Sequence, residues 1–373
     1  MTVYDVAIIG GGIAGAGLAA MIAGDARTIV MEMEDRPGYH TTGRSAAFYA
    51  ETYGGPAVQP LTTASKPFFQ SPPPGLSDVP LFGPRGCLHI AEADTLDHLA
   101  AMDRDFAASG VRLDPVDRAG MEAVLPALGP QWVEARSEPD CRDMDVAALH
   151  QGFLRVARRA SAEISCGAMV RGAERNGGRW LITTGAGVVK ADIVVIAAGA
   201  WADEAAMLFG AAPVGIQPLR RTMVQATTLP EMRPDLPLVV DAAGRFYFRP
   251  EGASLWVSPH DETPDSAHDV QPEEMDIAVA VDRFEQAGQW RVSRITRAWA
   301  GLRSFTPDRA PVYGHDPKVP GLFWCAGQGG FGIQTAPAAS AMAAAILLGR
   351  PGRFWSVDVD PGRYDPARFA EIR

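Results

Sequence analysis

The sequence has few cysteines, no long apolar run and fewer basic than acidic residues. Its four cysteines are widely separated and form no C-x-x-C pair, which predicts reduced thiols in a cytoplasmic protein. The seven histidines show no spacing typical of metal ligands, so we expect no metal site. No run approaches the roughly 18–20 apolar residues of a transmembrane segment. With 34 Lys and Arg against 44 Asp and Glu, the charge of −10 argues against a nucleic-acid partner or an acidic membrane.

The composition is that of a soluble globular protein, with 47% hydrophobic and 21% charged residues. A chain of 373 residues is long enough for two domains, each with its own core. The apolar N-terminal stretch lacks a basic region, carries Asp5 and is interrupted by three consecutive glycines. We therefore do not interpret it as a secretory signal.

The first forty residues combine strand, glycine and helix signals. An apolar run at 3–9 predicts a buried strand, and Gly10, Gly12 and Gly15 fit the pattern G-x-G-x-x-G. A helical pattern reaches about Gly24, and a second strand is expected at 28–31. This order is typical of a dinucleotide-binding unit, in which the glycines let a pyrophosphate approach the helix N-terminus.

An acidic residue, Glu32, ends the second predicted strand. It lies 20 residues after Gly12, where a carboxylate can accept hydrogen bonds from ribose hydroxyls. The same charge repels a 2′-phosphate. The pattern therefore fits FAD or NAD and disfavours NADP.

A polar turn follows at 41–45 and predicts a helix that begins near Arg44 or Ser45. Its N-terminus could meet the same pyrophosphate, although an ordinary capped surface helix has the same pattern. In "WLITTGAGVVKADIVVIAAGAWAD" we expect two strands joined by a turn at 185–187, and a third buried strand at 193–197.

Near the C-terminus, "GLFWCAGQGGFGIQTAPAASAMAAAILLG" predicts a strand at 322–326, a glycine-rich turn and a helix. We expect Thr335 as the helix N-cap, Pro337 in the first turn and Gly349 as the C-terminal stop. So many glycines allow backbone N–H groups to lie against a flat ligand, and the helix dipole favours negative charge at its N-terminus.

Several segments together resemble the D-amino-acid oxidase-like family of FAD-dependent oxidoreductases, and within it the bacterial D-arginine dehydrogenases. They are "GGGIAGAG", "MEMEDRPGYHTTGRSAAFY", "MDVAALHQGFLR", "AAGAWAD", "AGLRSFTPDRAPVYG" and "AGQGGFGIQTAPA", in order and over almost the whole chain. The resemblance implies FAD, which some members of the family attach through a cysteine or histidine. We expect non-covalent FAD here, because the only cysteine near the flavin-side motifs, Cys325, lies inside a predicted strand. The implied FAD contacts are Gly10, Gly12, Ile13, Ala14, Gly15, Glu32, Thr42, Arg44, Ser45, Ala46, Val170, Ala198, Gly199, Trp201, Arg303, Gly329, Gly330, Phe331, Gly332, Ile333 and Gln334.

The expected fold is α/β, with a Rossmann-like FAD-binding domain and an inserted mixed β-sheet domain that binds substrate. The cofactor-binding segments predict a discontinuous FAD domain of 1–55, 141–215 and 299–373. Residues 56–140 and 216–298 would form the substrate domain. Its sheet is expected from strand-like runs such as "RTMVQATTL", "RFYFRP" and "SLWVSP".

Arg303 stands in the apolar stretch "AWAGLRSF", where a buried guanidinium requires an anion. An internal partner such as Asp308 is one possibility. The resemblance implies instead that Arg303 and Arg221 bind the carboxylate of a substrate, with catalytic-site hydroxyls from Tyr247 and Tyr53. Strand alternation admits only one of Arg220 and Arg221 to such a pocket, and Tyr53 could equally be a packing aromatic.

The sequence departs from the D-arginine dehydrogenase pattern at two pocket positions. Cys87 stands where the relatives have the acid that meets the substrate guanidinium, and Phe48 where they have a histidine. Both changes predict a neutral, hydrophobic D-amino acid as substrate rather than D-arginine. The implied pocket residues are Phe48, Cys87, Gly301, Ile333 and Gln334.

The implied reaction is oxidative deamination of an amino acid, with hydride passing to flavin N5 and the imino acid hydrolysing to a 2-oxo acid and ammonia. Oxidation of a secondary amine acid such as sarcosine, of glycine or of a 2-hydroxy acid remains an alternative, as does a non-catalytic flavin-binding protein. The electron acceptor (oxygen, a quinone or another carrier), any general base and the oligomeric state stay open.

Overall fold

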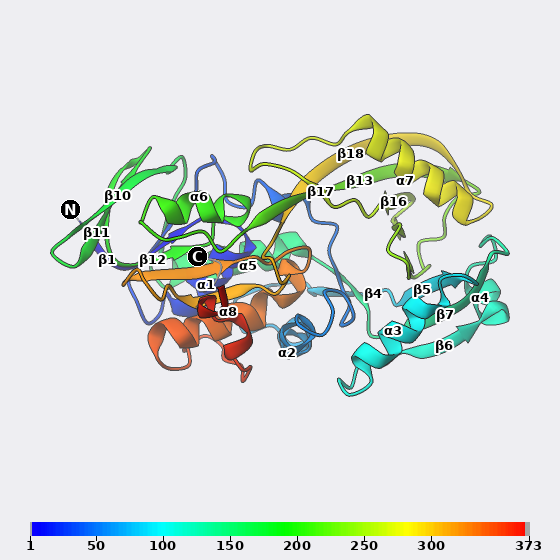
Figure 1. The fold of residues 1–373 in the computed structure, drawn as a ribbon, viewed down its shortest axis with the longest axis horizontal. Coiled ribbons are helices and arrows are strands. Elements are labelled where there is room, and N and C mark those ends of the chain that lie inside the picture. Colours follow the sequence, from blue (N-terminus) through cyan, green and yellow to red (C-terminus); the bar gives the residue numbers. More distant parts are fainter. Residues whose placement is uncertain (1, 370–373) are drawn as a thin grey trace.

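The computed structural model describes residues 2–369 as a two-lobed molecule (Figure 1). Both ends of the chain lie in one lobe, and segments from the middle of the sequence form the other. The fold is mixed α/β, as expected from the sequence.

The first lobe contains an eight-stranded sheet. Its central strands are parallel, whereas β10, β11 and β19 are antiparallel additions. The strands are, in spatial order, β10 (Val170–Asn176), β11 (Arg179–Thr184), β12 (Gly187–Ile196), β1 (Val3–Ile9), β2 (Thr28–Met31) and β9 (Glu163–Ser165), with β20 (Leu322–Ala326) on β12 and β19 (Val312–His315) on β20.

Both faces of this sheet are covered, which explains the continuous apolar run of β1. Val6 and Ile8 of β1 pack on the helical side with α1 (Ile13–Ile22), α2 (Gln59–Gln70), α5 (Val146–Arg159) and α8 (Gly332–Leu348). Ala7 and Ile9 face the opposite side, toward α6 (Ala202–Met207).

The second lobe is built on a nine-stranded sheet. Its strands are, in order, β17 (Thr263–Pro264), β13 (Gln217–Leu229), β16 (Ser254–Ser258), β15 (Tyr247–Glu251), β14 (Leu238–Asp241), β5 (Cys87–Glu92), β7 (Trp132–Glu138) and β6 (Asp114–Asp117), with β18 (Arg291–Phe305) paired to β13. The helices near this sheet are α3 (Leu96–Phe106), α4 (Arg118–Val124) and α7 (Glu274–Ala287). The three strand-like runs noted in the sequence all lie in this sheet.

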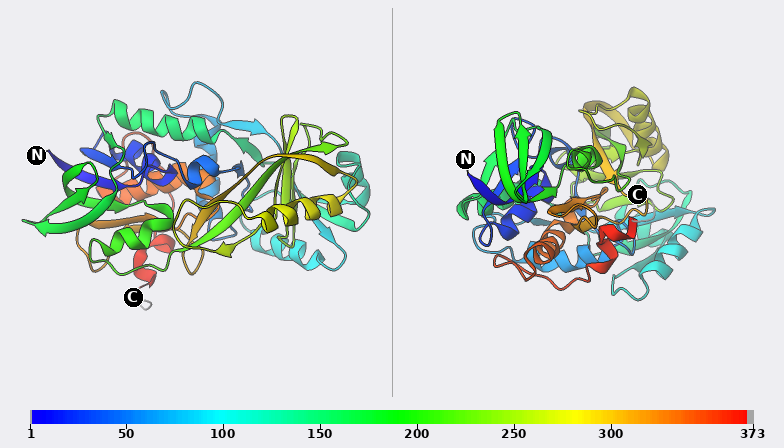
Figure 2. Two further views of the ribbon diagram at one scale, coloured as in Figure 1. Left: turned by 90° about the horizontal axis from the view of Figure 1, so that it is seen from above. Right: turned by 60° about the vertical axis from the view of Figure 1, so that its left-hand side comes forward.

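Smaller elements complete the chain. A three-stranded sheet contains β3 (Phe48–Tyr49), β8 (Arg142–Met144) and β4 (Phe82–Pro84). The 3-10 turns are η1 (Thr41–Arg44), η2 (Gly199–Trp201), η3 (Gly362–Tyr364) and η4 (Pro366–Phe369). The long strands β13 and β18 extend from the second lobe toward the first (Figure 2), so their ends reach the cofactor-side elements. The exact domain boundaries remain a prediction.

The helix expected to begin near Arg44 or Ser45 is absent. Residues 41–44 form only the single turn η1, and Ser45 has extended backbone angles. Two long-range contacts explain the difference. Trp299 donates from its indole N–H to the Arg44 carbonyl at 2.8 Å, and Phe48 pairs with Asp143 in the small sheet. An intrahelical hydrogen bond to the Arg44 carbonyl would have to displace the Trp299 contact.

Two further expectations need correction. The strand expected at 193–197 is the second half of β12, whose first half pairs with β11 while its second half lies beside β1. In α8, Phe331 is the N-cap residue, so Thr335 and Pro337 lie inside the helix. The Thr335 hydroxyl donates to the Phe331 carbonyl at 2.9 Å. Gly349 ends α8 with φ of +67°, which confirms the C-terminal stop.

Candidate active site

The carboxyl ends of the parallel strands form one edge of a large cavity. Gly10 follows β1 with φ of +104°, and a Cβ there would lie 2.4 Å from the Ala197 carbonyl oxygen. Only glycine fits this turn. Gly12 is the N-cap of α1, so the helix N-terminus faces the same edge. Crevices at this edge of a parallel sheet are the usual ligand sites.

Gly15 has a different role from its neighbours. A Cβ at this position would lie 2.0 Å from the Gly10 carbonyl oxygen, and Gly15 does not line the cavity. It therefore lets α1 pack against the strand-end turn, as its place in the glycine pattern predicts.

Glu32 follows β2 and faces the cavity with 7% of its surface exposed. Its carboxylate accepts hydrogen bonds from the backbone N–H of Gly11 at 2.9 Å and of Glu34 at 3.0 Å. These bonds hold the carboxylate at the cavity edge, and its remaining lone pairs can accept ribose hydroxyls.

The turn η1 meets the N-terminus of α1. The Thr42 hydroxyl accepts a hydrogen bond from the Ile13 N–H at 2.9 Å, and Arg44 donates to the carbonyls of Val270 and Ala300 at 2.8 and 3.2 Å. Residues 41–44 therefore connect the first helix to segments of the second lobe.

One cavity of about 580 Å³ runs between these elements and the second lobe. Every site residue expected from the sequence lines this cavity, except Gly15 and Cys87. Those that line it are Gly10, Gly12, Ile13, Ala14, Glu32, Thr42, Arg44, Ser45, Ala46, Phe48, Tyr53, Val170, Ala198, Gly199, Trp201, Arg221, Tyr247, Gly301, Arg303, Gly329, Gly330, Phe331, Gly332, Ile333 and Gln334.

Two buried arginines face the far end of this cavity. In the antiparallel ladder of β13 and β18, Arg221 pairs with Gly301 and Leu219 pairs with Arg303. Arg221 and Arg303 are thus diagonal neighbours on one face of the sheet. Both are buried, with exposures of 5% and 7%, and both line the cavity.

The internal partner of Arg303 is Glu262 and not Asp308, which pairs with Arg368. Arg303 also donates to the phenolic oxygen of Tyr53 at 2.6 Å. Its Nε atom is buried without a hydrogen-bond partner, as is Nη1 of Arg221. The two guanidinium groups are therefore not fully hydrogen-bonded within the protein, which is unusual for buried charged groups.

An aromatic wall lies beside the arginines. The ring of Phe48 is 5.3 Å from that of Tyr53 and 5.9 Å from that of Tyr247, and the Arg221 guanidinium lies 5.8 Å from the Tyr247 ring centre. Burial raises the pKa of both phenols, so both stay neutral at ordinary pH. Cys87 is 1% exposed in the apolar cluster with Phe48 and Tyr247, behind this wall and outside the cavity lining.

The side-chain amide of Gln334 is used within the protein. It donates to the Tyr53 carbonyl at 3.0 Å and to the Thr62 hydroxyl at 3.1 Å, and accepts from the Ala50 N–H at 3.1 Å. These bonds position the segment that carries Tyr53. They leave Gln334 little capacity for a ligand through its side chain.

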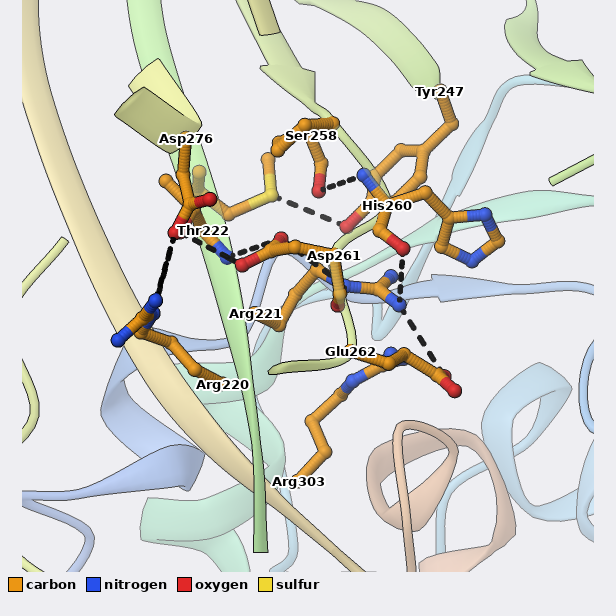
Figure 3. A network of polar contacts seen from close by, with 12 residues as sticks. Arg220, Arg221, Thr222, Tyr247, Ser258, His260, Asp261, Glu262, Asp276 and Arg303 are labelled. Carbon is orange, nitrogen blue, oxygen red and sulfur yellow. Dashed lines mark hydrogen bonds and ion pairs between the residues drawn. The ribbon is translucent and has the colours of Figure 1, made fainter. Parts of the chain in front are cut away.

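Sequence reasoning missed the loop 259–262, which surrounds Arg221 (Figure 3). The carbonyl of Asp261 accepts from Arg221 Nε at 2.7 Å, and the carbonyl of His260 from Nη2 at 3.4 Å. His260 has φ of +57°, and burial, with the nearby Arg221 charge, lowers its pKa to about 3. The run "SPHDETPD" has no motif that could have shown this arrangement.

The fold and this cavity define a flavin-dependent oxidoreductase. The chain belongs to the family described as FAD dependent oxidoreductase (DAO), whose model matches residues 5–346. Among relatives, the hydrogen cyanide synthase subunit HcnC of Pseudomonas aeruginosa is 25% identical over an alignment of 418 residues, covering 98% of this chain and 96% of that protein. The D-amino acid dehydrogenase of Xanthobacter autotrophicus is 27% identical over 74% of this chain and 65% of that enzyme.

Solved structures show the same fold. The crystal structure of glycine oxidase from Geobacillus kaustophilus superposes with a TM-score of 0.85 over 99% of both chains, at 20% sequence identity. That of L-proline dehydrogenase from P. horikoshii gives 0.82 over 99% of this chain and 98% of that one, at 20% identity. These likenesses concern the architecture.

FAD is the cofactor of this family, and the residues around the cavity fit it. The glycines at the end of β1 bring backbone to the cavity edge, the N-terminus of α1 favours phosphate, and Glu32 is placed for ribose hydroxyls. In the described part of the chain, no helix is long and apolar enough to cross a membrane, and no group of three or more side chains could hold a metal ion.

Proposed function

We propose that the protein oxidises the amine of a D-amino acid with a neutral, hydrophobic side chain, giving a 2-oxo acid and ammonia through an imino acid. The observation that carries this proposal is the placement of two buried guanidinium groups, Arg221 and Arg303, at one end of the family's cofactor cavity. Each guanidinium has one nitrogen without a hydrogen-bond partner in the protein, and two adjacent cations attract a carboxylate.

In this proposal Arg221, Arg303 and the phenols of Tyr53 and Tyr247 hold the substrate's carboxylate and orient its Cα–H bond. When bound, FAD supplies the acceptor of the two electrons, taken as hydride from the α-carbon. The contribution of the chain is positioning and exclusion of water. The substrate's ammonium group gives up a proton to water, the nitrogen lone pair forms the C=N bond as the hydride leaves, and water then hydrolyses the imino acid.

The proposed side-chain preference rests on the wall formed by Phe48, Tyr53 and Tyr247. Phe48 lines the cavity, whereas Cys87 lies behind it and offers no charge. A cationic side chain would meet no carboxylate at either position. We therefore expect D-alanine, D-valine, D-leucine, D-methionine or D-phenylalanine to react faster than D-arginine or D-lysine.

The same rings favour a second candidate. Phe48 lies within 6 Å of both tyrosine rings, and a pocket narrowed by these three rings would suit glycine or sarcosine. A 2-hydroxy acid would use the same carboxylate contacts. A flavin-binding protein without activity is the remaining alternative.

Anaerobic bleaching of the bound flavin tests these options in one panel. The substrates are D- and L-amino acids, glycine, sarcosine and D-lactate at equal concentration. Fastest bleaching by an apolar D-amino acid supports the proposal, whereas preference for D-arginine contradicts the predicted selectivity. Bleaching by none of them would favour a non-catalytic role. Peroxide production measured beside dye reduction separates oxygen from other electron acceptors.

We further propose that the FAD is held without a covalent bond. Among the described residues no cysteine lines the cavity, and Nε2 of the lining residue His40 is 2.9 Å from the Glu34 carboxylate. Acid precipitation should release all of the flavin into the supernatant. Flavin that stays with the pellet would contradict this.

A further inference from the structure

The two cavity arginines share a carboxylate from the protein itself. Oε1 of Glu262 lies 2.8 Å from Nη2 of Arg303 and 3.5 Å from Nη2 of Arg221. The same oxygen lies 2.8 Å from Nη2 of Arg309, whose nitrogen is also 3.0 Å from Oε2. Figure 3 shows Glu262 between Arg221 and Arg303.

The position of Glu262 is set by the loop before it. The Asp261 carboxylate accepts from the Thr222 backbone N–H at 2.8 Å and from its hydroxyl at 2.9 Å. The Asp261 carbonyl is bound to Arg221. These hydrogen bonds fix the loop to β13. The backbone of the loop therefore places Glu262 next to the guanidinium groups.

Glu262 approaches the arginines from outside the cavity. Arg221 and Arg303 line the cavity, and Glu262 does not. Its side chain is 34% exposed, compared with 6% and 8% for the side chains of Arg221 and Arg303. Nε of Arg303 and Nη1 of Arg221 have no hydrogen-bond partner within the protein. A substrate carboxylate in the cavity and Glu262 outside it would therefore act on the same two cations from different sides.

Two carboxylates bound to one pair of cations repel each other, and each weakens the other's attraction to the pair. On the basis of the proposed function, we propose that Glu262 is an internal counter-ion that competes for Arg221 and Arg303 with the substrate's carboxylate. It stabilises the two buried charges when the site is empty of substrate and lowers the affinity for substrate in return.

Arg309 gives Glu262 a third cationic partner, which does not line the cavity. It follows β18, is 52% exposed, and lies over the ring of Phe305 at 3.9 Å from the ring centre. Both Glu262 oxygens contact Arg309, whereas only Oε1 contacts Arg303. Glu262 can consequently weaken its bond to Arg303 when substrate binds without becoming an unpaired charge.

The first test is Glu262→Gln, which keeps the shape and an acceptor oxygen but removes the charge. We expect KM for the preferred amino acid and the dissociation constant of acetate, followed through the flavin absorption spectrum, to fall roughly fivefold. kcat should change little. The melting temperature should fall, because two buried cations lose a counter-ion. A merely structural role for Glu262 predicts the lower melting temperature with KM unchanged or raised, and either result would overturn the proposal.

The second test is Arg309→Gln, which should have the opposite effect on affinity. Without Arg309, Glu262 binds Arg303 more strongly, so KM and the acetate dissociation constant should rise. In the double variant E262Q/R309Q the Arg309 effect should disappear, because it acts through Glu262. If the Arg309 effect persists at full size, Arg309 attracts anions directly, and its proposed role through Glu262 is wrong.

Glu273→Gln is the matched control. Glu273 is also an acid paired with a buried arginine, but its partner is Arg220, which does not line the cavity. KM and acetate affinity should be those of the wild type.

Acetate binding also separates the proposed role of Glu262 from the proposed reaction. If no amine or amino acid bleaches the flavin but E262Q still binds acetate more tightly, the proposed reaction fails and the role of Glu262 stands.

Discussion

Arg220 and Arg221 are adjacent in the sequence, but their guanidinium groups lie on opposite faces of β13. Arg221 lines the cavity, whereas Arg220 pairs with Asp276 at 3.2 Å (Figure 3). Arg220 also pairs with Glu273, whose side chain is exposed. Both are buried to a similar extent, at 7% and 5% exposure. Strand alternation thus gives two chemically identical side chains different environments.

This pair provides the first prediction. Arg221→Gln removes one of the two proposed carboxylate forks, and kcat/KM should fall about 10–100-fold through the loss of a charge-assisted hydrogen bond. Arg220→Gln should leave KM unchanged and lower the melting temperature instead, because Asp276 loses its partner. Steady-state kinetics and thermal unfolding of both variants decide this. Equal kinetic effects would mean that the cavity arginine is not a substrate ligand.

Local patterns were sufficient to predict three of the parallel strands in the cofactor-side lobe. The bounds of β1, β2 and β20 agree with the runs at 3–9, 28–31 and 322–326. Each of these strands is a buried apolar run followed directly by a glycine or a glutamate. The run and the residue that ends it lie within a few positions of each other, so a local pattern contains both. Strand alternation also predicted that only one of Arg220 and Arg221 faces the cavity. It could not predict which of the two does so.

Contacts between distant residues account for what sequence could not predict. Phe48 is in a strand because it pairs with Asp143, far along the chain, whereas its neighbours have the pattern of a capped helix. Glu262 lies 41 residues from Arg303 in sequence and carries no motif. The prediction that an internal acid could pair with Arg303 was reasonable, but the acid was Glu262 and not the nearby Asp308.

Glu32 gives the second prediction, which concerns FAD affinity. Glu32→Gln replaces the carboxylate that is proposed to accept hydrogen bonds from the ribose hydroxyls of FAD. The FAD dissociation constant should therefore rise about tenfold or more. The measurement is fluorescence titration of apoprotein with FAD. Glu34→Gln is the control, since Glu34 pairs with His40 and does not line the cavity. If the two variants bind FAD equally well, the proposed role of Glu32 is wrong.

Gly330 gives the third prediction. A Cβ at this position would lie 2.3 Å from both Nη1 of Arg303 and the Tyr53 hydroxyl. Both atoms end flexible side chains, so Gly330→Ala should fold normally but displace the arginine, with KM raised about tenfold. Gly24→Ala is the control, because nothing lies within 4 Å of a Cβ there. A wild-type KM for Gly330→Ala would show that Arg303 need not keep this position.

His260 gives the last prediction, on stability and pH. Its pKa is about 3 in the folded protein, because burial and the Arg221 charge disfavour the imidazolium, against 6.5 as the ordinary value. Between these pH values the unfolded chain binds a proton that the folded protein does not, so stability is complete above pH 6.5 and is lost as pH falls toward 3. His260→Asn tolerates the positive φ and removes this contribution. Between pH 7 and pH 5, the variant should lose roughly 1–2 kcal/mol less unfolding free energy than the wild type, measured by urea denaturation. Equal losses in the two proteins would mean that His260 titrates normally and that its environment is more open to water than the structure shows.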